Sequence, residues 1–449
     1  MAEASVALDA GIAPTGGVSV GRRRYILTLL MIAYVLSFLD RQVLGILGES
    51  IKKDLHLKDA DLGILTGPVF VLFYTFLGVP IAWLADRRSR PVIISLSLAL
   101  WSGFTALSGF ATSFVPLALA RLGVGFGEAG CNPSSHSLIA DISRPDQRAS
   151  GLAFYSMGVP IGTLLGLAMG GLVADAWGWR AAFLVAAAPG LVLAAIIALT
   201  VREPRVVEIP VSLATSILSP AKDMWEVIGA VAHKPTFWLA AAGAGFSAFV
   251  GYGEIYFNSS FFQRCHLPEL TQIAAGFHMK PLTFLGLALG VVTGVGGLTG
   301  TLVGGAIADR GARGDRRLFA SVPAVVALIA IPFIYAVFTT QSTVLALVLL
   351  LVPNVAATIW YGAVYSTAQS VVAPRYRATA AALLLLILNL IGLGLGPPAL
   401  GALSDYLAKH GLGAAEGLRW AMIDSGMVSV VAAGLFWLAR RTIREDVVS

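Results

Sequence analysis

Apolar stretches of about 20 residues recur along the whole chain, from Tyr25 to Leu438, and they leave few folds open. A helix of that length crosses a bilayer hydrocarbon core of roughly 30 Å. Hydrophobic residues make up 57% of the 449 residues and charged residues only 12%, whereas about a quarter of the residues of a soluble domain are charged. The sequence therefore predicts an all-α polytopic membrane protein.

We expect twelve transmembrane helices. Their predicted ranges are 24–47, 62–85, 91–111, 114–140, 147–174, 180–201, 236–262, 282–308, 317–338, 342–369, 376–404 and 418–440. The residues before Arg22 hold no apolar run of the kind that forms a cleavable signal, so we expect the first helix to be retained.

Most of the 31 lysine and arginine residues fall on alternate predicted loops, beginning with the N-terminal segment. The side of a membrane protein that is rich in these residues is the cytoplasmic one. We therefore expect both termini in the cytoplasm and, because short loops are typical of a bacterial protein, a location in the bacterial inner membrane. This bias also accounts for the net charge of +6, so no nucleic-acid partner is expected. Cys131 and Cys265 lie in a helix and an outer loop, and we expect no disulfide.

The motif Ala-Asp-Arg ends a predicted helix twice, with its acid at Asp86 and again at Asp309, about half a chain apart. A repeat of this length predicts two six-helix bundles related as parallel repeats. Two unrelated basic inner loops are the alternative. The predicted division is a cytoplasmic segment (1–23), an N-terminal bundle (24–201), a cytoplasmic linker (202–235), a C-terminal bundle (236–440) and a cytoplasmic tail (441–449).

The repeated loop resembles the signature loop between the second and third helices of the major facilitator superfamily. The resemblance implies the major facilitator fold, whose members mostly work as monomers. It also implies a cytoplasmic gate in which acids and arginines of the two loops latch the bundles together. The residues at the matching positions are Asp86, Arg87, Arg90, Asp309 and Arg310.

Four charged residues of the first half lie deep inside predicted helices, away from the helix ends. They are Asp40, Arg41, Arg121 and Glu128. A charge at the bilayer centre costs on the order of 2.5–3.5 kcal/mol, so it needs a partner or water. Arg121 and Glu128 share a helix face but lie two turns apart, which is too far for a direct pair. We therefore predict that Glu128 pairs with Arg41 and that Arg121 pairs with Asp40.

These pairs predict proton coupling. The proton affinity of a buried carboxylate depends on whether a guanidinium stays beside it, and an anionic substrate can compete for that guanidinium. We expect Glu128 or Asp40 to act as the proton switch, and Arg41 or Arg121 to contact the anion. The proton is the coupling ion, and no other cofactor is expected. A static network of salt bridges is the alternative, although buried pairs often add little net stability.

The second half is poorer in charge and richer in aromatic side chains near its predicted helix centres. Glu254 is the one acid of its helix and lies off the aromatic stripe. Such stripes more often pack helices than bind ligands, yet a charged half facing an aromatic half would suit an amphiphile. Possible cavity-lining residues are His136 of the first half and Phe249, Tyr252, Tyr256, Asn354, Tyr361 and Tyr365 of the second.

Several segments of the first half resemble the Spinster-type lipid transporters. They are SFLDR (37–41), ADRRSR (85–90), the segment 121–162 with its Gly-x-Gly-Glu-Ala at 125–129, and WGWRAAFLVAAAPG (177–190). Animal Spinster proteins export sphingosine-1-phosphate or lysophospholipids. The resemblance implies a proton-coupled carrier of an anionic lysolipid or similar amphiphile, embedded in a lipid bilayer. It also implies functional roles for the same four buried charges.

Three other functions are compatible with the sequence. Leu-Asp-Arg at 39–41 also occurs in symporters of small organic anions, and GVPIG at 158–162 resembles an antiporter motif of multidrug efflux carriers. A receptor or scaffold would show no turnover. An enzyme is not expected, because the sequence has no nucleotide-binding loop, no metal-ligand spacing and no Ser/His/Asp set.

Overall fold

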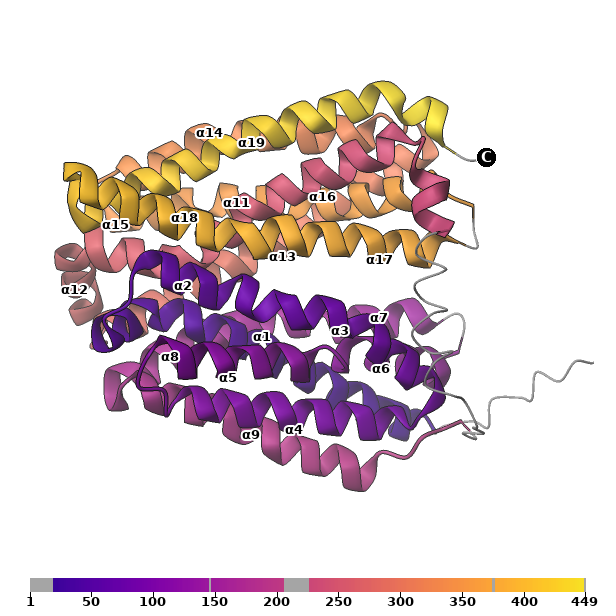
Figure 1. The fold of residues 1–449 in the computed structure, drawn as a ribbon, viewed down its shortest axis with the longest axis horizontal. Coiled ribbons are helices and arrows are strands. Elements are labelled where there is room, and N and C mark those ends of the chain that lie inside the picture. Colours follow the sequence, from indigo (N-terminus) through magenta and orange to yellow (C-terminus); the bar gives the residue numbers. More distant parts are fainter. Residues whose placement is uncertain (1–18, 145–146, 206–225, 374–375, 448–449) are drawn as a thin grey trace, which may run out of the picture.

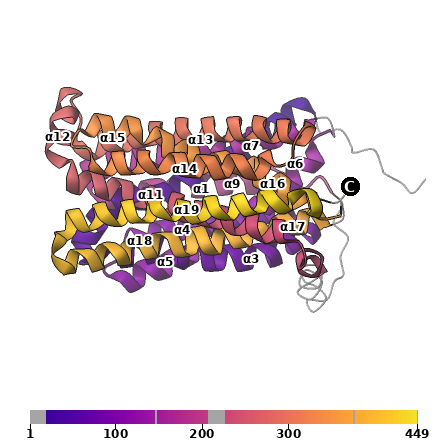
Figure 2. The same cartoon turned by 90° about the horizontal axis from the view of Figure 1, so that it is seen from above.

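The computed structural model describes residues 19–144, 147–205, 226–373 and 376–447, and every regular element in these ranges is a helix. Long helical rods run side by side along one axis, as Figure 1 and the perpendicular view in Figure 2 both show. In Figure 1 the first half of the chain fills the lower part of the view and the second half the upper part. The prediction of an all-α protein is confirmed.

The first half contributes six rods, three of them interrupted. In chain order they are α1 (Val20–Leu55), α2 (Asp59–Thr66) continued by α3 (Pro68–Arg87), α4 (Arg90–Ser108), α5 (Phe114–Glu128) continued by α6 (Cys131–Ile142), α7 (Arg148–Ser156) continued by α8 (Gly158–Trp177), and α9 (Trp179–Thr200).

The second half contributes six more rods. They are α11 (Pro235–Cys265), α13 (Pro281–Arg313), α14 (Leu318–Thr339), α15 (Thr343–Leu349) continued by α16 (Leu351–Ser370), α17 (Arg377–Leu388) continued through η3 (Asn389–Leu393) into α18 (Gly394–Leu407), and, after η4 (Ala408–Leu412), α19 (Gly413–Asp446). The short helix α12 (Leu267–Gly276) links α11 to α13 at one end of the molecule.

Ten segments in the described ranges are long and apolar enough to cross a membrane. One of them, Thr379–Asp446, covers both the α17–α18 rod and α19. Together with α11, these segments account for the twelve predicted helices. The predicted linker 202–235 lies mostly outside the described residues, and α11 begins at Pro235, one residue from the predicted start.

Local sequence sets the limits of several rods. The hydroxyl of Ser19 caps α1 by accepting a hydrogen bond from the backbone N–H of Arg22, at 3.3 Å. The same helix ends at His56, which adopts the left-handed conformation with φ of 54°. Pro235 and Pro281 open α11 and α13, where a missing N–H costs nothing.

The main helix pairs that join the two halves are α1 with α11, α8 with α13, and α2 with α18. The α8–α13 contact requires glycine, because a Cβ at Gly286 would collide with the carbonyl oxygen of Leu167 and a Cβ at Gly171 with that of Leu282. We call the end at which α12 lies the α12 end, and the opposite end, where α1 begins and α19 ends, the base.

Candidate functional site

Arg41 of α1 and Glu128 at the end of α5 form a buried ion pair, as the sequence predicted. The Arg41 guanidinium donates to one carboxylate oxygen, Glu128 Oε2, from Nη2 at 2.5 Å and from Nε at 3.0 Å. The hydroxyl of Ser37, one turn earlier on α1, donates to the same oxygen at 2.9 Å. Within the described residues the other oxygen, Glu128 Oε1, has no hydrogen-bond partner. This carboxylate is therefore held from one side only.

Asp40 and Arg121 form the second predicted pair. Arg121 Nη1 lies 2.9 Å from Asp40 Oδ2, and the hydroxyl of Thr105 on α4 donates to Asp40 Oδ1 at 2.7 Å. Both oxygens of Asp40 are thus occupied, whereas Glu128 keeps one oxygen free of partners. The Asp40 pair ties α1, α4 and α5 together and has the character of a structural bond.

Exposure separates the two arginines. The Arg41 side chain is 13% exposed, while the side chains of Arg121, Asp40 and Glu128 are each at most 3% exposed. Arg41 is therefore the more accessible of the two arginines. Three aromatic rings surround the Arg41 guanidinium, with ring centroids 4.7–5.1 Å away, and they hold it by cation–π attraction. The rings belong to Phe38, Phe70 and Tyr74.

The structure places the aromatic candidates of the second half in two groups. Tyr252, Asn354 and Tyr361 line one cavity between α11, α13 and α16. The other three are packed elsewhere: Tyr256 lies against Gly45 of α1, Phe249 packs on the main core, and Tyr365 packs on a smaller core within the second half.

His136, the remaining cavity candidate, is exposed on α6 and meets the ring of Tyr155 edge-on, with centroids 5.4 Å apart. Tyr155 in turn stacks on Tyr34 of α1 at 4.4 Å and donates to Asn132 at 2.5 Å. His136 therefore lies at the margin of a polar aromatic cluster between α1, α6 and α7. Its part in transport stays a prediction.

At the base, Arg90 is completely buried and binds within its own half. Its Nη1 lies 2.6 Å from Asp141 Oδ2 on α6, and its backbone N donates to Glu203 at 2.7 Å. Its guanidinium also pairs with Glu203. Burial raises the pKa of Glu203, but the hydrogen bonds from Arg90 outweigh burial and bring the pKa below its usual value. Arg90 thus fastens α4 to α6 and to the segment that follows α9.

The predicted cytoplasmic gate stays a prediction. The Arg90 partners given above all belong to the first half, and Asp309 and Arg310 are exposed on α13. The side chain of Asp86 lies outside the described part of the chain. Arg87 closes α3 next to it.

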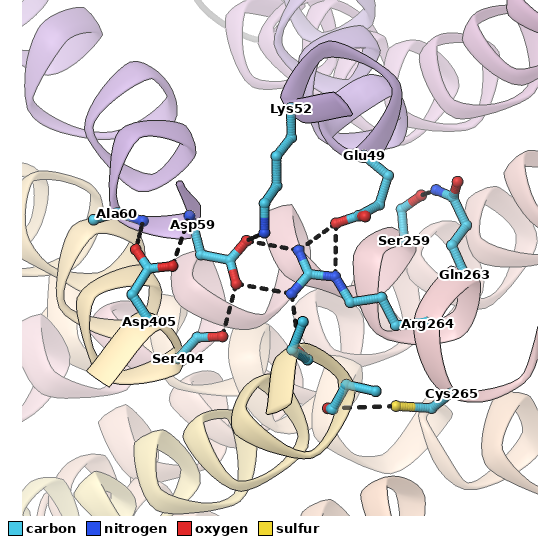
Figure 3. Close-up of polar contacts among 12 residues, drawn as sticks. Glu49, Lys52, Asp59, Ala60, Ser259, Gln263, Arg264, Cys265, Ser404 and Asp405 are labelled. Atoms are coloured by element: carbon cyan, nitrogen blue, oxygen red, sulfur yellow. Dashed lines mark hydrogen bonds and ion pairs between the residues drawn. The ribbon is translucent and has the colours of Figure 1, made fainter. Parts of the chain in front are cut away.

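A network of ion pairs at the α12 end crosses between the halves (Figure 3). Arg264 of α11 lies at its centre, with Nη2 2.6 Å from Asp59 Oδ1 and Nη1 2.8 Å from Asp59 Oδ2. Its Nε donates to Glu49 of α1 at 2.8 Å, and Lys52 reaches Asp59 at 2.6 Å. An arginine of the second half therefore binds two acids of the first.

A second bond of the same network caps α2 from the other half (Figure 3). The carboxylate of Asp405 on α18 accepts hydrogen bonds from the backbone N–H groups of Asp59 and Ala60, at 3.2 and 2.9 Å. Ser404 donates to Asp59 Oδ2 at 2.7 Å. An acid at a helix N-terminus satisfies free N–H groups and complements the helix dipole. These bonds join the two halves at the α12 end.

Similarity to known proteins identifies the family of this chain. Residues 30–397 match the profile of the Major Facilitator Superfamily. The chain belongs to the major facilitator superfamily. This facilitator is 30% identical to the MFS-type efflux pump of Mycolicibacterium smegmatis. The alignment spans 420 residues and covers 94% of this chain and 93% of the relative.

The facilitator is also homologous to Spinster proteins. It is 28% identical to protein spinster homolog 1 of Xenopus tropicalis over 450 residues, covering 96% of this chain and 83% of the relative. With protein spinster homolog 1 of Homo sapiens it shares 28% identity over 408 residues, covering 89% and 76%. The Spinster resemblance predicted from the sequence is confirmed, and the chain is a transporter rather than an enzyme.

Solved structures give the same result. A bacterial homologue of the human lysosomal transporter Spinster, in an inward-facing and unoccupied conformation, superposes with a TM-score of 0.84 at 33% identity, covering 96% of this facilitator and 100% of that chain. The occupied inward-facing form of that homologue superposes with a TM-score of 0.83. A D-xylose–proton symporter, at 17% identity and a TM-score of 0.67, shares the fold.

Sequence reasoning missed the α12-end network of this facilitator. Its acids and bases lie at helix ends, where charged residues are common, and Glu49 and Arg264 are 215 residues apart. The acid-rich turn around Asp59 was the one sequence signal that pointed to this network, because these acids lie at the start of a helix beside a buried bundle. Nothing in the sequence pairs it with Arg264.

Proposed function

We propose that this facilitator is a proton-coupled carrier of an anionic lysolipid or similar amphiphile that works by alternating access. The pair of Arg41 and Glu128 carries the proposal. It combines a partly exposed cation with a fully enclosed acid that has one oxygen without a partner. That combination is suited to coupling the binding of an anion to the binding of a proton, because one guanidinium can pair with either Glu128 or the anion.

The coupling has two steps. An anionic head group that binds Arg41 draws the guanidinium away from Glu128 and leaves Ser37 as the remaining donor to that carboxylate. A buried carboxylate without a cation binds a proton, since an isolated charge in an apolar interior is costly. Loss of that proton restores the charge on Glu128, which recovers Arg41 and releases the anion. Substrate binding and protonation are thereby linked.

The surroundings of Arg41 favour an amphiphile over a small acid. Phe38, Phe70 and Tyr74 surround the guanidinium, and Tyr256 of α11 packs against Gly45, one helical turn further along α1. A head group bound at Arg41 therefore has apolar and aromatic side chains on both halves within reach of its chain. A small organic anion would leave that apolar surface unused.

Closure at the α12 end supports an inward-facing arrangement. Arg264, Asp59 and Asp405 join the halves there, and the superposable bacterial Spinster homologue is inward-facing. The lysine and arginine bias at the base supports the same orientation, with the base and both termini in the cytoplasm of a bacterial inner-membrane protein. In the opposite state the α12 end opens and the predicted gate at Asp86, Arg87, Arg90, Asp309 and Arg310 closes.

Efflux of amphiphilic compounds is the second candidate. The observation that favours it is the 30% identity to a protein named as an efflux pump over 94% of this chain. Both candidates share the alternating-access cycle, and they differ in whether one substrate class or many chemically unrelated compounds are moved.

The test is transport by purified protein in liposomes under an imposed pH gradient. Labelled lysophospholipid and sphingosine-1-phosphate would be compared with a small organic acid and a cationic dye. Gradient-driven movement of the lipids alone, lost when an ionophore collapses the gradient, supports the proposal. Movement of the organic acid without the lipids would contradict it. Movement of all four would favour polyspecific efflux.

A further inference from the structure

A cavity lies within the second half, between α11, α13 and α16. Its volume is about 120 Å³, well above the roughly 10–15 Å³ that one water molecule needs. Glu254 and Asn258 of α11 line it, together with Tyr252 and Tyr361. None of the charged pairs described above uses this space, and the mechanism built on Arg41 and Glu128 gives it no task.

Two hydrogen-bond acceptors in this cavity lack partners. Glu254 is 6% exposed, and within the described residues its Oε1 accepts no hydrogen bond. Asn258 lies one turn further along the same face of α11, is 5% exposed, and its Oδ1 is also without a partner. Buried polar atoms normally find partners, and an unpaired acid is the most costly exception. A charged Glu254 in this cavity therefore needs a donor that carries positive charge.

Aromatic rings flank the acid. Tyr252 and Tyr361 line the cavity, and Trp360 lines a smaller cavity of about 40 Å³ that Glu254 also borders. The rings of Trp360 and Tyr361 stack with centroids 4.1 Å apart. Aromatic faces attract organic cations. A carboxylate, an amide oxygen and aromatic walls together form a recognition set for an organic ammonium group that can donate hydrogen bonds.

We propose that the cavity at Glu254 is a subsite for an ammonium group of the carried molecule. Glu254 balances the charge and Asn258 Oδ1 accepts a hydrogen bond from the same group. This inference rests on the proposed function and deepens it: the preferred substrate is an amphiphile whose anionic group binds Arg41 in the first half and whose ammonium group binds Glu254 in the second. Each half then contributes one charged side chain to the binding of the substrate.

The test compares two lysophospholipids with the same acyl chain in binding titrations with the full-length protein in nanodiscs. Lysophosphatidylethanolamine carries a primary ammonium group and lysophosphatidylglycerol does not. The wild type should bind the ethanolamine lipid roughly tenfold or more tightly, the effect of one charge-assisted hydrogen bond. Glu254→Gln should abolish this preference without weakening the binding of lysophosphatidylglycerol. Glu254→Asp should keep part of the preference.

Glu416→Gln is the matched control, because Glu416 is a partly exposed acid at the start of α19 that pairs with Arg419. It should keep the full preference. An unchanged preference in Glu254→Gln would overturn the subsite. An equal loss of binding for both lipids in Glu254→Gln, at an unaltered melting temperature, would also overturn it, since that result would make Glu254 a purely structural residue.

Failure of the proposed function gives a different result. If the wild type binds neither lipid, the lysolipid proposal fails, and hexylammonium is then compared with hexanol as a short probe. Binding of hexylammonium that disappears in Glu254→Gln would retain the ammonium subsite on a carrier of other amines. Equal binding of the two probes, or binding that is indifferent to Glu254, would overturn the subsite as well.

Discussion

Arg264 and Asp59 form a two-point ion pair across the boundary between the halves, with nitrogen–oxygen distances of 2.6 and 2.8 Å. The pair is largely buried, since the Arg264 side chain is 8% exposed and that of Asp59 is 3% exposed. A planar guanidinium facing a carboxylate is the most directional ion pair that proteins make. Opening of the α12 end must separate these two residues, so the pair sets part of the free-energy difference between the two states.

Replacing Arg264 with alanine should therefore favour opening at the α12 end. Cys265, the next residue, is half-buried and provides a native thiol for the measurement. We expect its labelling by a maleimide to accelerate several-fold in Arg264→Ala. Arg180→Ala is the control, because Arg180 pairs with Asp54 inside the first half and should leave labelling unchanged. Equal labelling rates in Arg264→Ala and wild type would show that the pair does not hold this end closed.

Arg41→Ala should weaken the binding of anionic substrates far more than the binding of neutral ones. A charge-assisted hydrogen bond contributes about 1.5–3 kcal/mol, so the affinity for an anionic lysolipid should fall roughly 10–100-fold. The measurement is a binding titration with an anionic lysolipid and an uncharged monoacylglycerol of equal chain length. A matching loss for both ligands would indicate that the substitution damages the cavity instead.

Arg121→Met should lower stability rather than selectivity. Arg121 and Asp40 are both buried, and removal of one partner leaves an uncompensated charge, at a cost of about 3–5 kcal/mol. Thermal unfolding in detergent should show a clear drop in melting temperature. The double variant Asp40→Asn/Arg121→Met should recover much of the loss, because neither charge is left alone. A double variant no more stable than the single one would contradict this account.

Acid should loosen the base of the first half. The pKa of Glu203 is lowered in the folded protein, so its bond to Arg90 contributes its full stability above the ordinary value of 4.5 and loses it as the pH falls through the folded value. Protection of the segment after α9 against hydrogen exchange, taken relative to the intrinsic rate at each pH, should fall below about pH 4.5 in the wild type. Glu203→Gln should show the lower protection already at neutral pH and little further change in acid.

The sequence was sufficient to predict the two buried pairs of the first half. Asp40 and Arg41 are adjacent and Arg121 and Glu128 are two turns apart, so the helical repeat alone restricts which charges can meet. It also predicted the family, because the motifs at 37–41 and 125–129 are short and local. Which arginine is the more exposed was not predictable, since exposure depends on how Phe38, Phe70 and Tyr74 pack around Arg41.

Features that depend on packing between distant segments were not predicted. The break between α2 and α3 falls inside the predicted helix 62–85, at Gly67, where a Cβ would lie 2.6 Å from the carbonyl oxygen of Leu393. Glu254 was recognised as a lone acid, but its cavity exists only because α11, α13 and α16 leave space around it. Helix periodicity carries no information about such gaps.

The most direct test of proton coupling is proton movement into liposomes that contain the purified protein, followed with a pH-sensitive dye when lysolipid is added. The wild type should move protons together with the lipid. Glu128→Gln, which keeps the shape of the side chain and removes its charge, should fold normally and still bind lipid, but should move no protons. Lipid-dependent proton movement that persists unchanged in Glu128→Gln would contradict the central role given to the Arg41–Glu128 pair.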